Sequence, residues 1–254
     1  MIHALIGLVR QEFITGRRYW LNMLSGVAFG YILFVLLFFG VQSFAPAGLG
    51  GAVESLVVGY WVVLLTNMCY QSIESFVGME AMAGTLEQLY LSPFPFGWLA
   101  LGKVLGAVLF YLALNVPFLA LIMATTGRWL HIDVLSIAPL VLVVMAQAFG
   151  LGFAMGGVML IVKQVGQLSQ AVSMLLVVCI AAPPNLSPLV SLLPYNLAWR
   201  LLRSVMADSV PLWRLPPGDL AFVAAQTAVL VLVGGLVYRW CEKVAKRRGL
   251  LGQH

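Results

Sequence analysis

The most prominent feature of the sequence is a series of long apolar stretches without charge. Six of them contain no Asp, Glu, Lys or Arg, and they cover residues 19–53, 55–73, 104–127, 134–162, 164–199 and 220–238. About 20 apolar residues in a helix cross the roughly 30 Å hydrocarbon core of a bilayer, so each stretch can hold one span. We expect six membrane-spanning helices, near residues 20–42, 54–77, 99–125, 135–161, 165–183 and 219–240.

The composition agrees with this pattern. Hydrophobic residues make up 62% of the chain and charged residues only 9%, where a soluble domain carries about 25% charge. A soluble globular protein is therefore excluded. The 254 residues fit one all-α transmembrane domain over 1–254, with short connections and no room for a separate soluble catalytic domain.

The distribution of Lys and Arg predicts the orientation. If both termini are cytoplasmic, ten of the 14 basic residues lie inside and four outside, which the positive-inside rule favours. We therefore expect a multi-pass protein of the cell inner (plasma) membrane with both termini in the cytoplasm. The net charge of +5 is explained by this topology, and no nucleic acid is expected as a partner.

Residues 1–18 predict an amphipathic helix at the membrane interface. Apolar side chains recur there at helical spacing, while His3, Arg10 and Arg17 are seven residues apart on another face. Two interpretations stay open. The helix either fixes topology as a basic anchor, or it docks a partner protein.

Two connections between the spans have a character of their own. Residues 78–95 are too polar for the bilayer core but favour a helix, which Pro93 and Pro95 end, so we expect a short cytoplasmic helix. Residues 184–210 contain short apolar pieces separated by prolines. These pieces predict two short re-entrant helices before the last span, and an ordinary external loop is the alternative.

Polar residues inside the predicted spans form two stripes. Asn67, Gln71 and Glu74 follow one face of the second span, and Gln167 and Gln170 begin the fifth. Polar and charged groups avoid lipid, so these residues line a cytoplasm-facing cavity between the two helices or form interhelical hydrogen bonds within one subunit. The sequence does not separate these two interpretations.

The segment Gly84-Thr85-Leu86-Glu87-Gln88-Leu89-Tyr90-Leu91-Ser92-Pro93, after the second span, resembles the signature of the type-2 ABC exporter permeases. The layout of the whole chain is similar to that family as well. The resemblance implies a half-transporter, in which two copies of the permease pair and two separate ABC ATPase subunits dock beneath them. It also implies a coupling helix at residues 84–91, and it makes the polar residues of the second and fifth spans the candidate translocation pathway. The residues expected to couple to the ATPase are Gly84, Thr85, Leu86, Glu87 and Gln88, with Arg10 and Arg17 of the N-terminal helix.

The expected function is ATP-driven export of an amphipathic substrate by alternating access. Mostly apolar spans favour a drug-like molecule or a lipid as cargo, and a lipid-linked glycan is the main alternative. We find no catalytic residues, metal ligands or nucleotide site in the chain, so ATP and Mg²⁺ are expected on the partner ATPase. Two other classes stay open: a proton-coupled secondary transporter, and a membrane assembly factor without transport activity.

Overall fold

The computed structural model describes residues 7, 10, 13–18, 20–44, 50–82, 96–162, 166–181 and 193–247. Within these ranges all regular secondary structure is helical. The elements are α2 (Trp20–Phe44), α3 (Gly50–Met82), α5 (Phe96–Thr126), α6 (Val134–Ile161), α7 (Gly166–Ala181), α8 (Asn196–Met206), the 3₁₀ turn η3 (Leu212–Arg214) and α9 (Pro217–Arg247). For the described residues, the prediction of an all-helical protein is confirmed.

Four described helical stretches are long and apolar enough to cross a membrane: Val53–Gly78, Gly102–Thr126, Val134–Ile161 and Pro217–Arg247. The apolar stretches described in α2 and α7 are shorter. Large apolar side chains also cover the outer surface of α9, where Leu232 and Leu236 are each 64% exposed. Water would penalise so continuous an apolar surface, whereas lipid solvates it, so the fold is consistent with a membrane protein.

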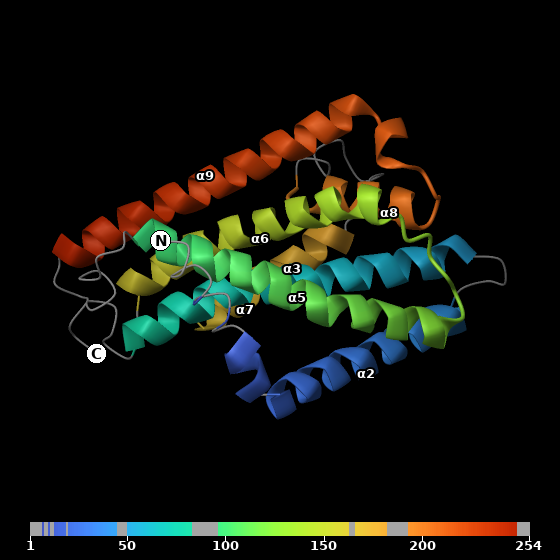
Figure 1. Ribbon diagram of the computed structural model, residues 1–254, viewed down its shortest axis with the longest axis horizontal. Helices are drawn as coiled ribbons and strands as arrows, with labels where there is room; N and C mark the ends of the chain where they lie inside the picture. The colour runs from blue at the N-terminus through green and yellow to red at the C-terminus, as the bar shows by residue number, and fades with distance from the viewer. Residues whose placement is uncertain are drawn as a thin grey trace.

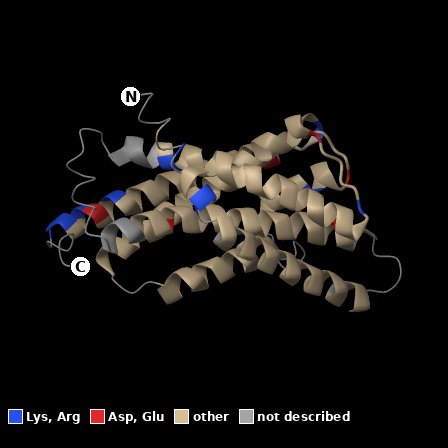
Figure 2. Ribbon diagram, turned by 60° about the horizontal axis from the view of Figure 1, so that its bottom comes forward, with Lys and Arg blue, Asp and Glu red and all other residues tan. Residues whose placement is uncertain are grey.

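The helices form an elongated bundle with α6 and α3 at its centre (Figure 1). The last helix, α9, lies along one edge of the bundle and α2 along the opposite edge. Helix α6 makes its most extensive contacts with α9 and α3, and α3 contacts α2, α5, α7 and α8 as well. Basic residues are concentrated in the last turns of α9, at one end of the bundle (Figure 2).

Glycines let α6 approach α3 closely. A Cβ atom at position 152 would lie 2.8 Å from the carbonyl oxygen of Tyr70, and one at position 156 would lie 3.1 Å from Cγ2 of Val77. Gly152 and Gly156 are four residues apart, the spacing of small residues that close helix packing requires, and they form a helix-packing face within the chain. Gly26 and Gly30 have the same spacing. A Cβ at Gly30 would face Tyr60 and Leu64, whereas nothing lies within 4 Å of a Cβ at Gly26.

A second set of glycines holds α9 against the other side of α6. A Cβ atom at position 234 would lie only 1.9 Å from the carbonyl oxygen of Gly150. Added Cβ atoms at positions 150 and 157 would each lie 2.8 Å from the backbone of α9, at Leu230 and Tyr238 respectively. The two helices therefore meet backbone to backbone, and no side chain fits between them.

Helix α8 is an amphipathic helix whose apolar face is buried against α6, α3 and α7. Before it, Tyr195 adopts the left-handed conformation with φ of 69°. Its backbone N–H donates to Gln147 Oε1 at 3.1 Å, and Gln147 Nε2 donates to Thr227 Oγ1 of α9 at 3.0 Å. One amide side chain thus ties α8 to the bundle. In the predicted 184–210 segment, residues 184–192 lie outside the described residues.

Gly234→Ala should destabilise the protein, because the new methyl group meets backbone rather than a flexible side chain. Overpacking of this kind costs about 1–3 kcal/mol. The neighbouring Gly235→Ala is a matched control, since nothing lies within 4 Å of a Cβ there and alanine favours a helix by about 1 kcal/mol. The measurement is the apparent melting temperature in detergent, followed by tryptophan fluorescence. Equal melting temperatures for the two variants would contradict the close contact.

Candidate functional site

Polar side chains of α3 and α7 meet inside the bundle. Glu74 is only 8% exposed although it lies within an apolar stretch, and its Oε2 accepts a hydrogen bond from the hydroxyl of Ser169. The hydroxyl of Tyr70 lies 3.3 Å from Ser169 Oγ. A serine has one O–H to donate, so Tyr70 donates to Ser169 and Ser169 donates to Glu74. The three side chains form one directed chain of hydrogen bonds.

A second contact joins the same two helices, about two turns away along α3 and one turn away along α7. Ser173 donates its hydroxyl proton to Asn67 Oδ1, while Asn67 Nδ2 donates to the carbonyl oxygen of Val63 at 3.1 Å. Both ends of the Asn67 amide are therefore satisfied. We call these five residues, Asn67, Tyr70, Glu74, Ser169 and Ser173, the polar seam.

The local sequence explains why the seam forms. Asn67, Tyr70 and Glu74 are three and four residues apart, and Ser169 and Ser173 are four apart, so each set lies on one helix face. Serine is small, so the backbone of α7 can lie close to α3 while each hydroxyl still reaches its acceptor. The face of α7 continues with the buried side chains of Leu176 and Ile180. Most other described side chains of α7 are exposed, so this face positions the helix.

The structure brings together only part of the predicted pathway. Asn67 and Glu74 lie in the polar seam, whereas Gln71, Gln167 and Gln170 are exposed on the surface of the single chain. The sequence analysis did not identify Tyr70 and Ser169 as partners of Glu74. The available signal was the spacing of the two serines, which share a face with Leu176 and Ile180.

Of the predicted coupling residues, the structure describes only those of the N-terminal helix. Gly84, Thr85, Leu86, Glu87 and Gln88 lie outside the described residues. Helix α3 is described as far as Met82, just before them. Arg10 and Arg17 are both exposed, and the described residues 13–18 are helical, with Phe13 packed edge to face on Phe110 of α5 at 5.5 Å between ring centroids.

The seam can hold a carboxylate within a stretch that is able to cross a membrane. A charged group at the bilayer centre costs about 2.5–3.5 kcal/mol on insertion scales, and hydrogen bonds to the charge offset part of that cost. The seam therefore both fixes α7 on α3 and keeps one ionisable group away from lipid.

A comparison with protein-family models finds no match for this chain, and neither does a comparison with curated proteins.

Ser169→Ala should lower stability, because it leaves the buried Glu74 carboxylate without its hydroxyl donor. The expected loss is about 1–2 kcal/mol, at the upper end of interhelical hydrogen bonds in membranes. Gln170→Ala is the control on the same turn, and its exposed side chain predicts a change within about 0.5 kcal/mol. Both variants would be compared with the parent by thermal unfolding in detergent. If they unfold alike, the hydrogen bond to Glu74 contributes nothing.

Proposed function

We propose that this chain is the membrane-spanning permease subunit of an ATP-driven exporter, with hydrolysis on a separate ATPase. The observation that carries the proposal is the path of α3. One unbroken helix runs from the polar seam at Glu74 to Met82, and the 84–93 motif follows directly. A displacement of the motif by a partner would reach the seam through about 12 Å of rigid helix.

Six spans are part of this proposal. Helices α2 and α7 occupy two of the predicted span ranges, and the four longer apolar stretches occupy the others. We place the ends of α3 and α9 that hold Met82 and Arg247 in the cytoplasm, where the excess of basic residues favours them. In this orientation α8 lies toward the outer face and is the second of the two re-entrant helices.

A second copy of the chain is the proposed partner within the membrane. Gln71, Gln167 and Gln170 are exposed on the single chain, and amide side chains are unfavourable in lipid. Pairing of two copies would remove them from lipid and place them beside a shared pathway. The cargo that fits the mostly apolar helices is amphipathic: a drug-like molecule, a lipid or a lipid-linked glycan.

A proton-coupled secondary transporter is the second candidate, and Glu74 is the observation that favours it. An ionisable side chain buried in a membrane stretch often marks a proton relay, and here two hydroxyl groups extend from it. Transport that stops when the proton gradient is collapsed, and continues without ATP, would select this candidate over the exporter.

Glu87→Ala tests coupling through the 84–91 segment. A carboxylate in a first helical turn contributes only about 0.3–1 kcal/mol locally, so the permease should still fold and insert, while co-purification with its ATPase should fall. Asp208→Ala is the control, because it removes an exposed carboxylate from the turn after α8, far along the chain from the motif. If ATPase stoichiometry and transport are unchanged in Glu87→Ala, the next candidate contact is the N-terminal helix with Arg10 and Arg17.

Glu74→Gln separates a functional charge from a structural one. The amide oxygen of glutamine can still accept the bond from Ser169, so the melting temperature should remain close to that of the parent. If the charge serves the pathway, stimulation of the complex's ATPase by a panel of amphipathic compounds should decrease. A lower melting temperature, with activity reduced only in proportion to the folded fraction, would assign Glu74 a purely structural role.

A further inference from the structure

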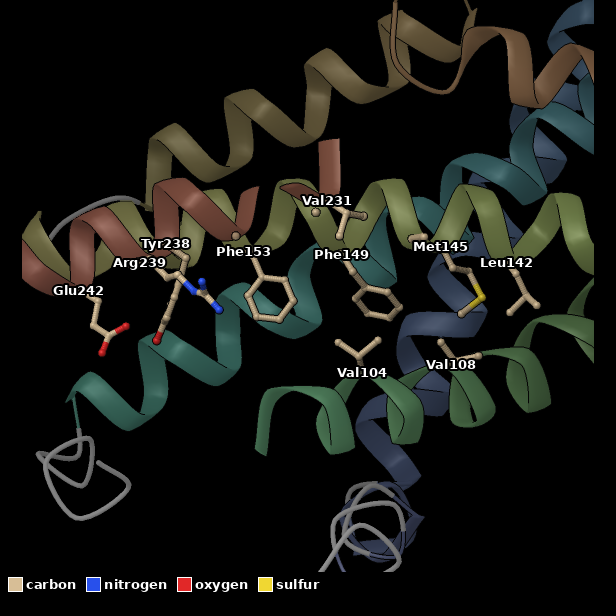
Figure 3. Close-up of a pocket in the computed structure, with 13 residues that line it drawn as sticks. Val104, Val108, Leu142, Met145, Phe149, Phe153, Val231, Tyr238, Arg239 and Glu242 are labelled. Carbon is tan, nitrogen blue, oxygen red and sulfur yellow. The ribbon is translucent and has the colours of Figure 1, made fainter. Parts of the chain in front are cut away.

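An apolar groove runs between α5 and α9, with α6 as its floor. Its volume is about 530 Å³. Figure 3 shows Phe153, Phe149 and Leu142 following one another along α6, Val108 of α5 on the facing side, and Arg239 of α9 at one end. Leu142 is 49% exposed and Val231 is 43% exposed, so the groove is open to the surroundings of the protein at these two positions.

The dimensions of the groove match one leaflet of a bilayer. From Leu142 to Phe153 the floor is about 16 Å long at 1.5 Å per helical residue, and half of a hydrocarbon core is about 15 Å. On α9 the charge-free residues 220–238 separate Asp219 from Arg239 by about 30 Å of helix, which matches the thickness of the whole core. Arg239 therefore lies at the level of the lipid headgroups.

The charges at this end favour an anion. Among the residues that the structure describes, Arg239 makes no ion pair, although its guanidinium borders the groove (Figure 3). The nearby carboxylate of Glu242 is already paired with Lys246, at 2.6 Å between Nζ and Oε1. On α5, the ammonium of Lys103 lies 5.2 Å from the ring centroid of Phe76 on α3. A planar guanidinium with free donors suits phosphate oxygens.

We propose that the groove between α5 and α9 binds one phospholipid with an anionic headgroup. An acyl chain lies along Phe153, Phe149 and Leu142, and the headgroup phosphate meets Arg239. The site lies on the side of α6 that faces α9, whereas the polar seam lies between α3 and α7. The inference rests on insertion of α5, α6 and α9 into a bilayer and is independent of the proposed export function.

Native mass spectrometry of the purified full-length chain tests the site. The protein is incubated with equal amounts of phosphatidylglycerol and phosphatidylcholine that carry the same acyl chains, and the lipids retained on each protein ion are counted. We expect phosphatidylglycerol to be preferred by about fivefold, which corresponds to about 1 kcal/mol for one basic side chain. Arg239→Gln should abolish this preference. Equal retention by the parent protein, or an unchanged preference in Arg239→Gln, would overturn the proposal.

Two further variants distinguish lipid binding in the groove from non-specific attraction of anionic lipid to surface charge. Lys243→Gln removes a basic residue one turn further along α9 that does not line the groove, and it should keep the preference. Gly235→Phe adds a ring where nothing lies within 4 Å of a Cβ, and it should reduce retention of both lipids severalfold. Loss of the preference in Lys243→Gln, or full retention in a folded Gly235→Phe, counts against the site.

A measurement on the unchanged protein keeps the proposal testable if Gly235→Phe does not fold. Phosphatidylglycerol with a diazirine in its acyl chain is photolysed on the protein in nanodiscs, and the labelled peptides are mapped. Labelling should be stronger in the groove, at Val108, Phe149 and Leu142, than on the outer surface of α9, at Leu232 and Leu236. Even labelling of both surfaces would show only bulk lipid and would overturn the proposal.

Discussion

The close approach of backbones on two sides of α6 is the constraint on which the rest of the bundle depends. Lipid tails are as apolar as the helices, so burial of apolar surface does little to join helices inside a bilayer, and direct packing has to do it. Gly152 and Gly156 admit α3, while on the other side of α6 Gly150 meets Gly234 of α9 and Gly157 meets Tyr238. Five positions without a side chain therefore set the distances among three helices.

The two other features of the molecule follow from these distances. With α3 fixed, its polar face is directed toward α7, where serine hydroxyls satisfy Asn67 and Glu74. With α9 drawn against α6, the bulky rings of Phe149 and Phe153 project beside the contact toward α5 (Figure 3). The rings line the space between α5 and α9 without filling it, and the groove remains. A polar contact and an apolar groove thus lie on different sides of the same packed core.

The sequence predicts the helices well because length and absence of charge are local properties. Gly152 and Gly156 are four residues apart and therefore share a helix face, but this spacing does not specify α3 as their partner. Gly26 and Gly30 have the same spacing, but only Gly30 makes a close contact. Its partner is Tyr60, thirty positions away, whose hydroxyl donates to the carbonyl oxygen of Gly30. The pairing of Glu74 with Ser169 spans 95 positions, and no local pattern specifies which serine meets which acid. The exposure of Gln71 likewise depends on where α7 packs.

The two kinds of contact respond differently to a displacement of α3. Interhelical hydrogen bonds in membranes contribute about 0.6 kcal/mol on average and up to about 1.7, so the seam can break and reform its bonds at small cost. The glycine contacts are van der Waals contacts along whole helix faces, so they cannot be replaced one at a time as hydrogen bonds can. Separating these helices would open a void along their length. A displacement entering at Met82 would therefore carry α6 and α9 with α3, and α7 would slide at the seam. In this arrangement Glu74 lies where relative movement of the helices costs the least free energy, and where a polar group can exchange one hydrogen-bond partner for another.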